Sequence, residues 1–355
     1  MTLRLLTLFA LLSLPTSGLA QEYVSDVKKE IQTAMKKQGI PGLSVAIVID
    51  NKIDYTGGFG FSDIENRVRA KPETIYRLAS ISKPITAIAV MQLVDAGKID
   101  LDAPVQKYVP GFPEKKWPLT TRHLLSHLGG VRHYKRPGEI NSTKHYPKLK
   151  EALEQFADDP LIFEPGTQYK YTTYGYNLLG CVVEAASGES FPDYLKKTIF
   201  TPAKMETAQT DNLYRIIPNR AQGYRWVKGK IQNSALADTS NKIPGGGLCS
   251  TVSDLAKLAI AMQSDRLVKP ETRKEMYQPA TLENGRPIRY GYGWNIRTHQ
   301  GRKEVGHSGG QQRVTTWLYM VPETKGAIVL MSNREGAKLL TLARTIYERA
   351  HKAEE

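Results

Sequence analysis

Apolar positions follow a helical spacing in some regions of the chain and an extended spacing in others. Apolar residues recur every three or four positions over 25–38, which predicts an amphipathic helix. The apolar run 43–49 and the segment 53–61 flank a short polar turn and predict a strand with its return strand. Near the other end of the chain, the patterns predict three strands and a closing helix, at 290–297, 313–321, 326–332 and 338–351.

The region between these two groups of strands, roughly residues 81–218, is mainly helical in pattern. Strands at both ends with helices between them predict an α/β (α+β) fold, in which one antiparallel sheet is built from both chain ends. The terminal helices would cover this sheet, and the helical region would be an insertion. A cleft between sheet and insertion is a common place for a site.

The first twenty residues have the pattern of a secretory signal peptide. Arg4 is followed by the apolar run 5–14, and Gly18-Leu19-Ala20 supplies small residues for cleavage. About ten apolar residues are too few to cross a bilayer core, which needs roughly twenty. We therefore expect a signal peptide over 1–20, one domain over 21–355, a secreted or periplasmic location and no stable membrane anchor.

Composition is that of an ordinary globular protein, with 41% hydrophobic and 24% charged residues, but the formal charge is +14. Such a charge raises the hypothesis of nucleic-acid binding. The excess is local, because nine Lys or Arg and only two Glu lie between Glu114 and Lys150, with four of the seven His. An exported protein would seldom meet nucleic acid. We therefore predict no nucleic-acid partner and interpret the stretch as a basic surface that could attract acidic substrates or envelope polymers.

Ser80-Ile81-Ser82-Lys83 is a Ser-x-x-Lys motif that could carry nucleophilic chemistry. Residues three apart on a helix share a face, so the lysine amine can reach the serine hydroxyl and take its proton. The same spacing occurs at Ser25 and Lys28, where a solvated helix face is the simpler interpretation. Ser80 instead precedes Pro84 and a long apolar run, which predicts that it stands at the start of a buried helix. Backbone N–H groups at a helix start favour developing negative charge.

Two further segments carry candidate chemistry. The tyrosine-rich segment 169–176 could be simple packing, or one of its phenols could shuttle a proton beside a lysine. Gly306-His307-Ser308-Gly309-Gly310 matches Gly-x-Ser-x-Gly, the nucleophile elbow of another hydrolase class. That elbow needs a following helix, whereas residues 311–321 have the pattern of a strand. We therefore interpret the segment as a His-x-Gly strand that lines a cleft.

The histidines and cysteines suggest no cofactor. His123, His127 and His133 lack a carboxylate or cysteine at a suitable spacing, so structural histidines are favoured over a metal site. Neither a phosphate-binding loop nor a dinucleotide fingerprint is present. We predict that neither a metal nor a cofactor is needed. Cys181 and Cys249 could be buried free thiols or a disulfide, and the sequence leaves both open.

Ser-x-x-Lys, a tyrosine motif and His-x-Gly follow one another in an order that resembles the serine beta-lactamase-like superfamily. This superfamily includes class C beta-lactamases, D-Ala-D-Ala peptidases and family VIII esterases. The resemblance runs from about Val24 to Ala350, and four other stretches support it: 124–130, 165–167, 176–180 and 245–251. Three stretches, 80–83, 109–115 and 131–134, look closest to the mitochondrial serine beta-lactamase-like branch.

The resemblance implies a beta-lactamase/transpeptidase-like fold and assigns roles by motif. Ser80 would be the acylated nucleophile, Lys83 its base and Tyr171 the proton shuttle to the leaving group. The backbone N–H groups of Ser80 and Gly310 would form an oxyanion hole, with Gly309 beside them. The implied activity is that of a serine hydrolase on a small-molecule or peptide substrate.

Two departures from the family pattern bear on the substrate. Thr173 stands in the substrate-binding set where many relatives have Asn, and His307 stands where Lys-Thr-Gly would supply a charged lysine. Both departures favour a peptidase or esterase over an efficient beta-lactamase. The alternative is a non-catalytic penicillin-binding-like or cell-wall peptide-binding protein. The particular substrate and the oligomeric state remain open.

Overall fold

The computed structural model describes residues 17–352. Residues 1–16, and with them most of the predicted signal peptide, lie outside the described residues. Helix α1 (Ser17–Gln38) begins at the first described residue and contains the predicted helix over 25–38. The exposed residues Ser25 and Lys28 lie on its outer side, as expected for a solvated face.

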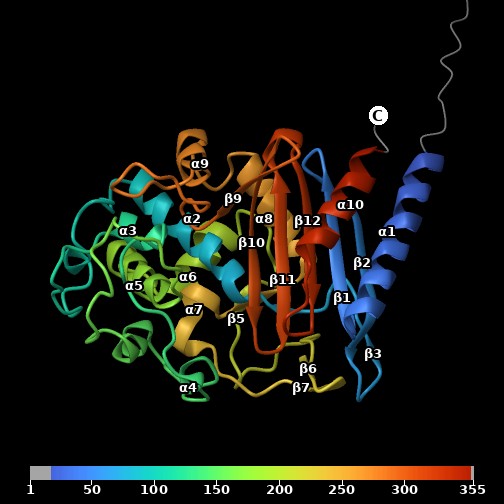
Figure 1. Ribbon diagram of the computed structural model, residues 1–355, viewed down its shortest axis with the longest axis horizontal. Helices are drawn as coiled ribbons and strands as arrows, with labels where there is room; N and C mark the ends of the chain where they lie inside the picture. Colours follow the sequence, from blue (N-terminus) through green and yellow to red (C-terminus); the bar gives the residue numbers. More distant parts are fainter. Residues whose placement is uncertain (1–16, 353–355) are drawn as a thin grey trace, which may run out of the picture.

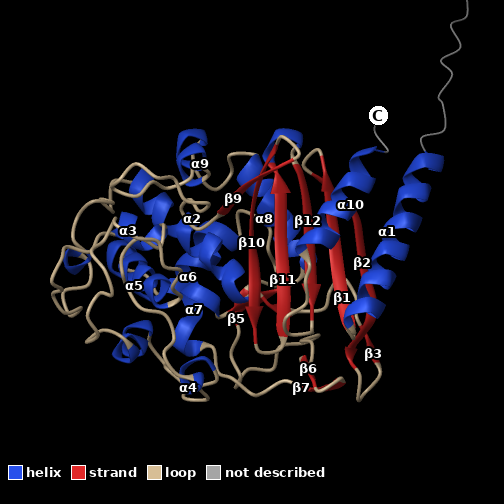
Figure 2. Cartoon of the chain, viewed as in Figure 1, coloured by secondary structure: helices blue, strands red, loops and turns tan. Residues whose placement is uncertain are grey.

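One antiparallel sheet of seven strands dominates the described chain, in the order β3-β2-β1-β12-β11-β10-β9. β1 pairs with β2 on one side and with β12 on the other, so the two chain ends meet at the centre of the sheet. Figures 1 and 2 show the helical region beyond the β9 and β10 side of the sheet. The predicted fold class is confirmed. The strands are β1 (Gly42–Ile49), β2 (Lys52–Asp63), β3 (Val68–Arg69), β9 (Asn295–His299), β10 (Arg302–Gln311), β11 (Val314–Val321) and β12 (Gly326–Ser332).

The sheet is covered on both faces, so its central strands β1, β11 and β12 are almost entirely buried. In β1, Leu43, Val45 and Ile47 point toward the terminal helices α1 and α10 (Leu340–Lys352), which lie side by side in Figure 1. Ala46 and Val48 point to the opposite face, toward α8 (Val252–Gln263). This alternation is the period of two that a strand imposes on its side chains.

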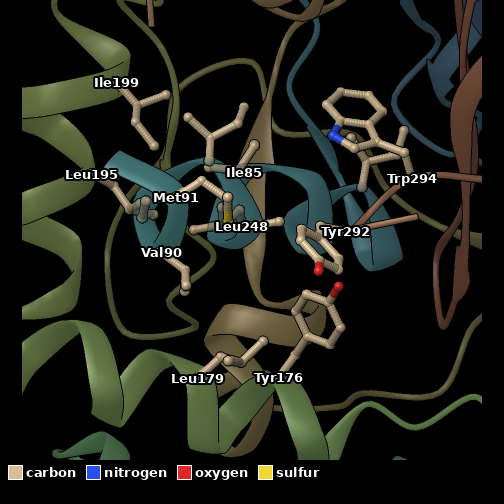
Figure 3. Packing of buried hydrophobic residues seen from close by; sticks show 14 of the residues in the cluster. Ile85, Val90, Met91, Tyr176, Leu179, Leu195, Ile199, Leu248, Tyr292 and Trp294 are labelled. Carbon is tan, nitrogen blue, oxygen red and sulfur yellow. The ribbon is translucent and has the colours of Figure 1, made fainter. Parts of the chain in front are cut away.

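Helix α2 (Ser82–Asp95) is the core of the helical region. Its side chains are buried on every side, including Ile85, Val90 and Met91, which Figure 3 shows packed among residues from several other elements. A helix that is apolar all round belongs in an interior. The surrounding helices are α3 (Thr121–Leu125), α4 (Pro137–Ile140), η3 (Leu149–Gln155), α5 (Tyr174–Ser187), α6 (Phe191–Leu195), η4 (Lys196–Phe200), α7 (Ile243–Gly246) and α9 (Pro270–Met276).

Short strands join the two regions. β4 (Tyr76–Arg77) and β5 (Gln209–Thr210) both pair with β8 (Leu248–Ser250), and β6 (Tyr224–Val227) forms a hairpin with β7 (Lys230–Asn233). β4 leads directly into the segment that carries Ser80. The pairing with β8 therefore fixes where the Ser-x-x-Lys motif enters the helical region.

The predicted strand over 290–297 begins later than expected. β9 starts only at Asn295, because Gly293 has φ of +85° and the Gly291 N–H donates to the Trp294 carbonyl, which closes a turn. A positive φ of this kind suits glycine and interrupts an extended strand. The turn leaves Tyr290 beside β10 instead of in the sheet, and this placement matters for the site.

The basic stretch between Glu114 and Lys150 is partly neutralised by carboxylates from outside it. Among the described ion pairs, Arg132 binds Asp159 and Lys135 binds the same carboxylate, while Arg122 binds Asp102. Lys144 also pairs, with Glu154. The local charge excess in the sequence therefore overstates the positive charge of this surface.

Two other sequence questions concern cysteines and membrane segments. Cys181 on α5 and Cys249 on β8 are separate, buried thiols, and burial raises the pKa of Cys181 to about 12. Within residues 17–352, no helix combines the length and the apolar character that crossing a bilayer requires.

Candidate active site

Ser80 lies in the 3₁₀ turn η1 (Ala79–Ile81), immediately before α2. Leu78, the residue before this turn, is anchored from two sides. Its N–H donates to the Leu248 carbonyl at 2.8 Å, and its carbonyl accepts from Thr316 Oγ1 at 3.0 Å. Ala79 then adopts φ of +49°, a left-handed conformation that costs a residue with a Cβ roughly 1–2 kcal/mol. The strained turn leaves Ser80 partly exposed at the start of an otherwise buried helix.

Lys83 faces Ser80 one helical turn on, as the motif predicts. Its Nζ lies 3.2 Å from Ser80 Oγ, 3.2 Å from Thr173 Oγ1 and 2.7 Å from the Gly245 carbonyl oxygen. The side chain is fully buried, and none of the ion pairs of the described residues involves it. Burial lowers the pKa of the Lys83 ammonium well below its usual range, and the nearby charge of Lys242 lowers that pKa further.

Tyr171 completes the group around Ser80. Lys83 Nζ lies 4.7 Å from the centroid of the Tyr171 ring, and the Tyr171 side chain lies near Ser80. Burial raises the pKa of Tyr171, and the nearby Ser80 hydroxyl offsets part of that rise. The phenol is therefore protonated at neutral pH and able to pass on a proton.

Strand β10 brings the His-x-Gly motif alongside η1. β9 pairs with β10 only over Arg302–Gly306, so among the described strands the segment His307–Gln311 has a partner, β11, on one side alone. A Cβ added to Gly309 would lie 2.2 Å from the Leu78 carbonyl oxygen, so only glycine permits this close approach. Gly310 faces open space. An unpaired strand edge next to Ser80 is the geometry that can offer backbone N–H groups to an oxyanion.

His307 is held as a neutral side chain. Its Nδ1 lies 2.6 Å from the Ser308 carbonyl oxygen and must donate to it, so Nε2 accepts a hydrogen bond from Tyr290 Oη at 3.0 Å. Burial lowers the pKa of His307 to about 3, with the charge of Lys83 as the next cause. His307 therefore brings no positive charge to this edge at physiological pH.

The structure gathers Ser80, Lys83, Tyr171 and Thr173 at one point, with the edge of β10 beside them. Thr173 lies with the lysine, because its buried hydroxyl contacts Lys83 Nζ. The two rival serines lie elsewhere. Ser25 is on the outside of α1, and Ser308 is paired opposite Trp317 in the middle of β10, with no strand-to-helix turn.

The histidines of the metal hypothesis have other partners. His127 Nδ1 accepts from the Thr172 N–H and His133 Nδ1 accepts from the Thr173 N–H, while His123 Nδ1 accepts from the Thr120 N–H at the start of α3. Within residues 17–352, no three histidine, cysteine or carboxylate side chains are grouped so that they could hold a metal ion.

Sequence reasoning missed two residues of the site, Lys242 and Tyr290. Lys242 is buried, donates to the Ile140 carbonyl at 3.1 Å, and has its pKa lowered to about 7, first by burial and then by Arg77. The available signal was weak: Lys242 lies three residues before the run Gly245-Gly246-Gly247. Tyr290 carried no signal beyond its place in a predicted strand.

Replacing Lys242 should change the pH dependence of any reaction that uses Lys83 as a base. A base must be unprotonated, so kcat/KM should fall as pH drops through the lowered pKa of Lys83. Lys242→Met removes a neighbouring positive charge, which raises the Lys83 pKa and shifts this acid limb to higher pH. Lys242→Arg keeps the charge and is the matched control. A pH–kcat/KM profile that is the same for wild type and Lys242→Met would refute the coupling.

Comparison with known proteins agrees with the fold and with the order of motifs along the chain. A family model described as Beta-lactamase matches residues 27–351, and the chain therefore belongs to this family. The resemblance to the serine beta-lactamase-like superfamily is thereby confirmed.

The similar proteins include bacterial, archaeal and mitochondrial members. The human serine beta-lactamase-like protein LACTB, mitochondrial, is 32% identical over 380 residues, covering 80% of this chain and 69% of the human protein. Penicillin-binding protein 4* of Bacillus subtilis is 28% identical, covering 79% of this chain and 65% of its own length. The octameric penicillin-binding protein homologue from Pyrococcus abyssi has a TM-score of 0.80 at 28% identity, covering 94% of this chain and 78% of the other.

Proposed function

We propose that this chain is a serine hydrolase that forms an acyl-enzyme on Ser80 and cleaves an amide or ester bond. The observation that carries the proposal is the set of partners around the Lys83 amine. A neutral amine has two N–H groups and one lone pair. The Gly245 carbonyl and the Thr173 hydroxyl can accept the two hydrogens, which leaves the lone pair for Ser80 Oγ at 3.2 Å. Lys83 is thereby arranged as the general base of a serine nucleophile.

The proposed reaction has two halves. Ser80 Oγ attacks the substrate carbonyl carbon while its proton passes to Lys83 Nζ, and the backbone N–H groups of Ser80 and Gly310 stabilise the oxyanion. The bond to the leaving group breaks, and the Tyr171 hydroxyl gives its proton to that group. The proton on Lys83 Nζ then moves to the Tyr171 oxygen. Water then attacks the acyl-enzyme by the reverse proton route and releases the acid. No metal or cofactor takes part in this scheme.

The state of His307 supports a peptidase or esterase over an efficient beta-lactamase. A charged lysine at that position could attract the carboxylate of a beta-lactam, whereas the buried, neutral His307 is occupied by Tyr290 and the Ser308 carbonyl. Thr173 is likewise engaged with Lys83. The names of the relatives, serine beta-lactamase-like and penicillin-binding, are compatible with chemistry at a serine and leave the substrate open.

Tyr171→Phe should lower turnover by about 10²-fold or more, because the variant keeps the ring but loses the proton-transferring hydroxyl. Steady-state hydrolysis of a chromogenic ester measures the effect. Tyr169→Phe and Tyr174→Phe serve as matched controls from the same segment. Near-normal rates for Tyr171→Phe would move the proton-transfer role to one of these neighbours.

A substrate panel tests the proposed function as a whole. Esters, D-amino-acid peptides and beta-lactams are offered to wild type and Ser80→Ala side by side. We expect wild type to turn over an ester or a peptide faster than any beta-lactam, and Ser80→Ala to turn over none. Failure of wild type on the whole panel would favour a non-catalytic peptide-binding protein of the same fold.

We also propose that the mature protein is exported and begins at Gln21, after the small residues Gly18-Leu19-Ala20. One relative is named as mitochondrial, so the location needs its own test. The mass of the protein recovered from the medium or periplasm of a bacterial host gives the start of the mature chain. A full-length protein confined to the cytoplasm would contradict the proposal.

A further inference from the structure

His127 lies directly behind Tyr171 and contacts the backbone on both sides of it. The Lys170 N–H donates to the His127 carbonyl oxygen at 3.0 Å, and the Thr172 N–H donates to His127 Nδ1 at 3.2 Å. Residues 168–172 belong to neither a helix nor a strand, so their N–H groups are not held by regular structure. The fully buried side chain and the carbonyl of His127 therefore hold the N–H of the residue before Tyr171 and the N–H of the residue after it.

The His127 ring also packs against the phenol itself. Its centroid lies 4.3 Å from that of Tyr171 and 4.7 Å from that of Tyr290, whose hydroxyl binds His307. Because Nδ1 accepts a hydrogen bond, a neutral ring carries its proton on Nε2, which has no hydrogen-bond partner among the described residues. The polar contacts of the side chain are thus all directed at the Tyr171 segment.

The backbone of His127 is itself unusual. It ends the turn after α3 with φ of +61°, a conformation that His and Asn adopt more readily than most residues. This conformation lets the carbonyl and the ring of one residue reach both sides of Tyr171. A side chain that only filled space would require neither the left-handed backbone nor a buried hydrogen-bond acceptor such as Nδ1.

We infer that His127 is a positioning residue that holds the Tyr171 hydroxyl beside Ser80 by fixing the backbone on both sides of the tyrosine. The inference rests on the proposed function, since it assigns His127 a role in the reaction of Ser80. A misplacement of about 1 Å in a reacting group can cost about 10² in rate. Loss of the His127 contacts should therefore lower kcat through Tyr171, with little effect on KM.

Two substitutions separate the hydrogen bond from the ring. His127→Asn offers Oδ1 in place of Nδ1 and tolerates the left-handed backbone, so we expect it to keep kcat within about 10-fold of wild type. His127→Phe keeps an aromatic ring but removes the acceptor, and we expect kcat to fall by about 10²-fold. His123→Phe is the matched control, because it also removes a histidine acceptor of a backbone N–H, on α3, away from Ser80. That control should retain wild-type kcat.

A double-mutant cycle with Tyr171→Phe gives the decisive readout, with ester hydrolysis as the assay and thermal melting as a check of folding. If His127 acts through Tyr171, adding His127→Phe to Tyr171→Phe should cost little more than Tyr171→Phe alone. Three results would overturn the inference. The kcat losses of His127→Phe and Tyr171→Phe could multiply in the double variant, His127→Asn could lose as much kcat as His127→Phe, or His127→Phe could keep the wild-type kcat. Absence of ester turnover in wild type would instead refute the proposed function, so the two failures are distinguishable.

Discussion

Ser80→Ala should lower ester turnover by a factor on the order of 10⁴ or more, which is the largest effect we expect from any single substitution. The reason is chemical and not structural. Ser80 is partly exposed, so removing its hydroxyl costs little packing, while Lys83 keeps its contacts to Thr173 and Gly245. The variant should therefore fold and melt like wild type while it loses the nucleophile. Initial rates with a chromogenic ester at high enzyme concentration measure the loss.

The chain offers two matched controls for this substitution. Ser25→Ala alters the second Ser-x-x-Lys motif, whose serine lies on the outer side of α1, and Ser308→Ala alters the Gly-x-Ser-x-Gly motif within β10. We expect Ser25→Ala to retain full activity and Ser308→Ala to retain most of it. A Ser80→Ala protein that still turns over ester at more than a few per cent of the wild-type rate would remove Ser80 from the mechanism.

Lys83→Met should produce the second-largest loss, about 10²- to 10⁴-fold in kcat/KM, because the general base is gone. Methionine has a similar length and needs no hydrogen bonds, so it suits a fully buried position better than a charged group does. We therefore expect a melting temperature at or above that of wild type. Lost activity without lost stability is what distinguishes a catalytic lysine from a structural one.

Lys83→Arg tests the protonation state that the base requires. Arginine retains a positive charge at every working pH, so it cannot take the Ser80 proton and should be as inactive as Lys83→Met. Lys28→Met on the exposed face of α1 is the control for lysine removal. Wild-type rates in Lys83→Arg would mean that this position needs a cation, and Lys83 would then have an electrostatic role.

The sheet and the serine-lysine pair were predictable because their causes are local. The nearly continuous apolar runs of β1 and α2 are properties of neighbouring residues, so the sequence pattern reveals them directly. The distance between Ser80 and Lys83 follows from the rise of a single helical turn. The start of β9 was misplaced because the turn at Gly293 depends on close packing against Ala87 and the Lys83 carbonyl, which are remote in sequence.

The remainder of the site depends on contacts between distant parts of the chain. Lys83 meets Gly245 across 162 positions and Thr173 across 90, and no local pattern fixes either contact. Lys242 shows the same limit, since nothing in the sequence around this lysine, which ends the short 3₁₀ helix η5 (Ser240–Lys242), indicates that it will be buried near another lysine. The only role that the sequence suggested for the His127 side chain was that of a metal ligand, whereas in the fold its Nδ1 accepts a hydrogen bond from the Thr172 N–H.

The central claim is that Ser80 becomes acylated, and trapping the covalent adduct tests this claim most directly. Wild type and Ser80→Ala are each treated with a fluorophosphonate probe and measured by intact-protein mass spectrometry, followed by peptide mapping. We predict one adduct per wild-type chain, on the peptide that contains Ser80, and none on Ser80→Ala. Labelling that persists in Ser80→Ala, or that maps to Ser25 or Ser308, would contradict the account.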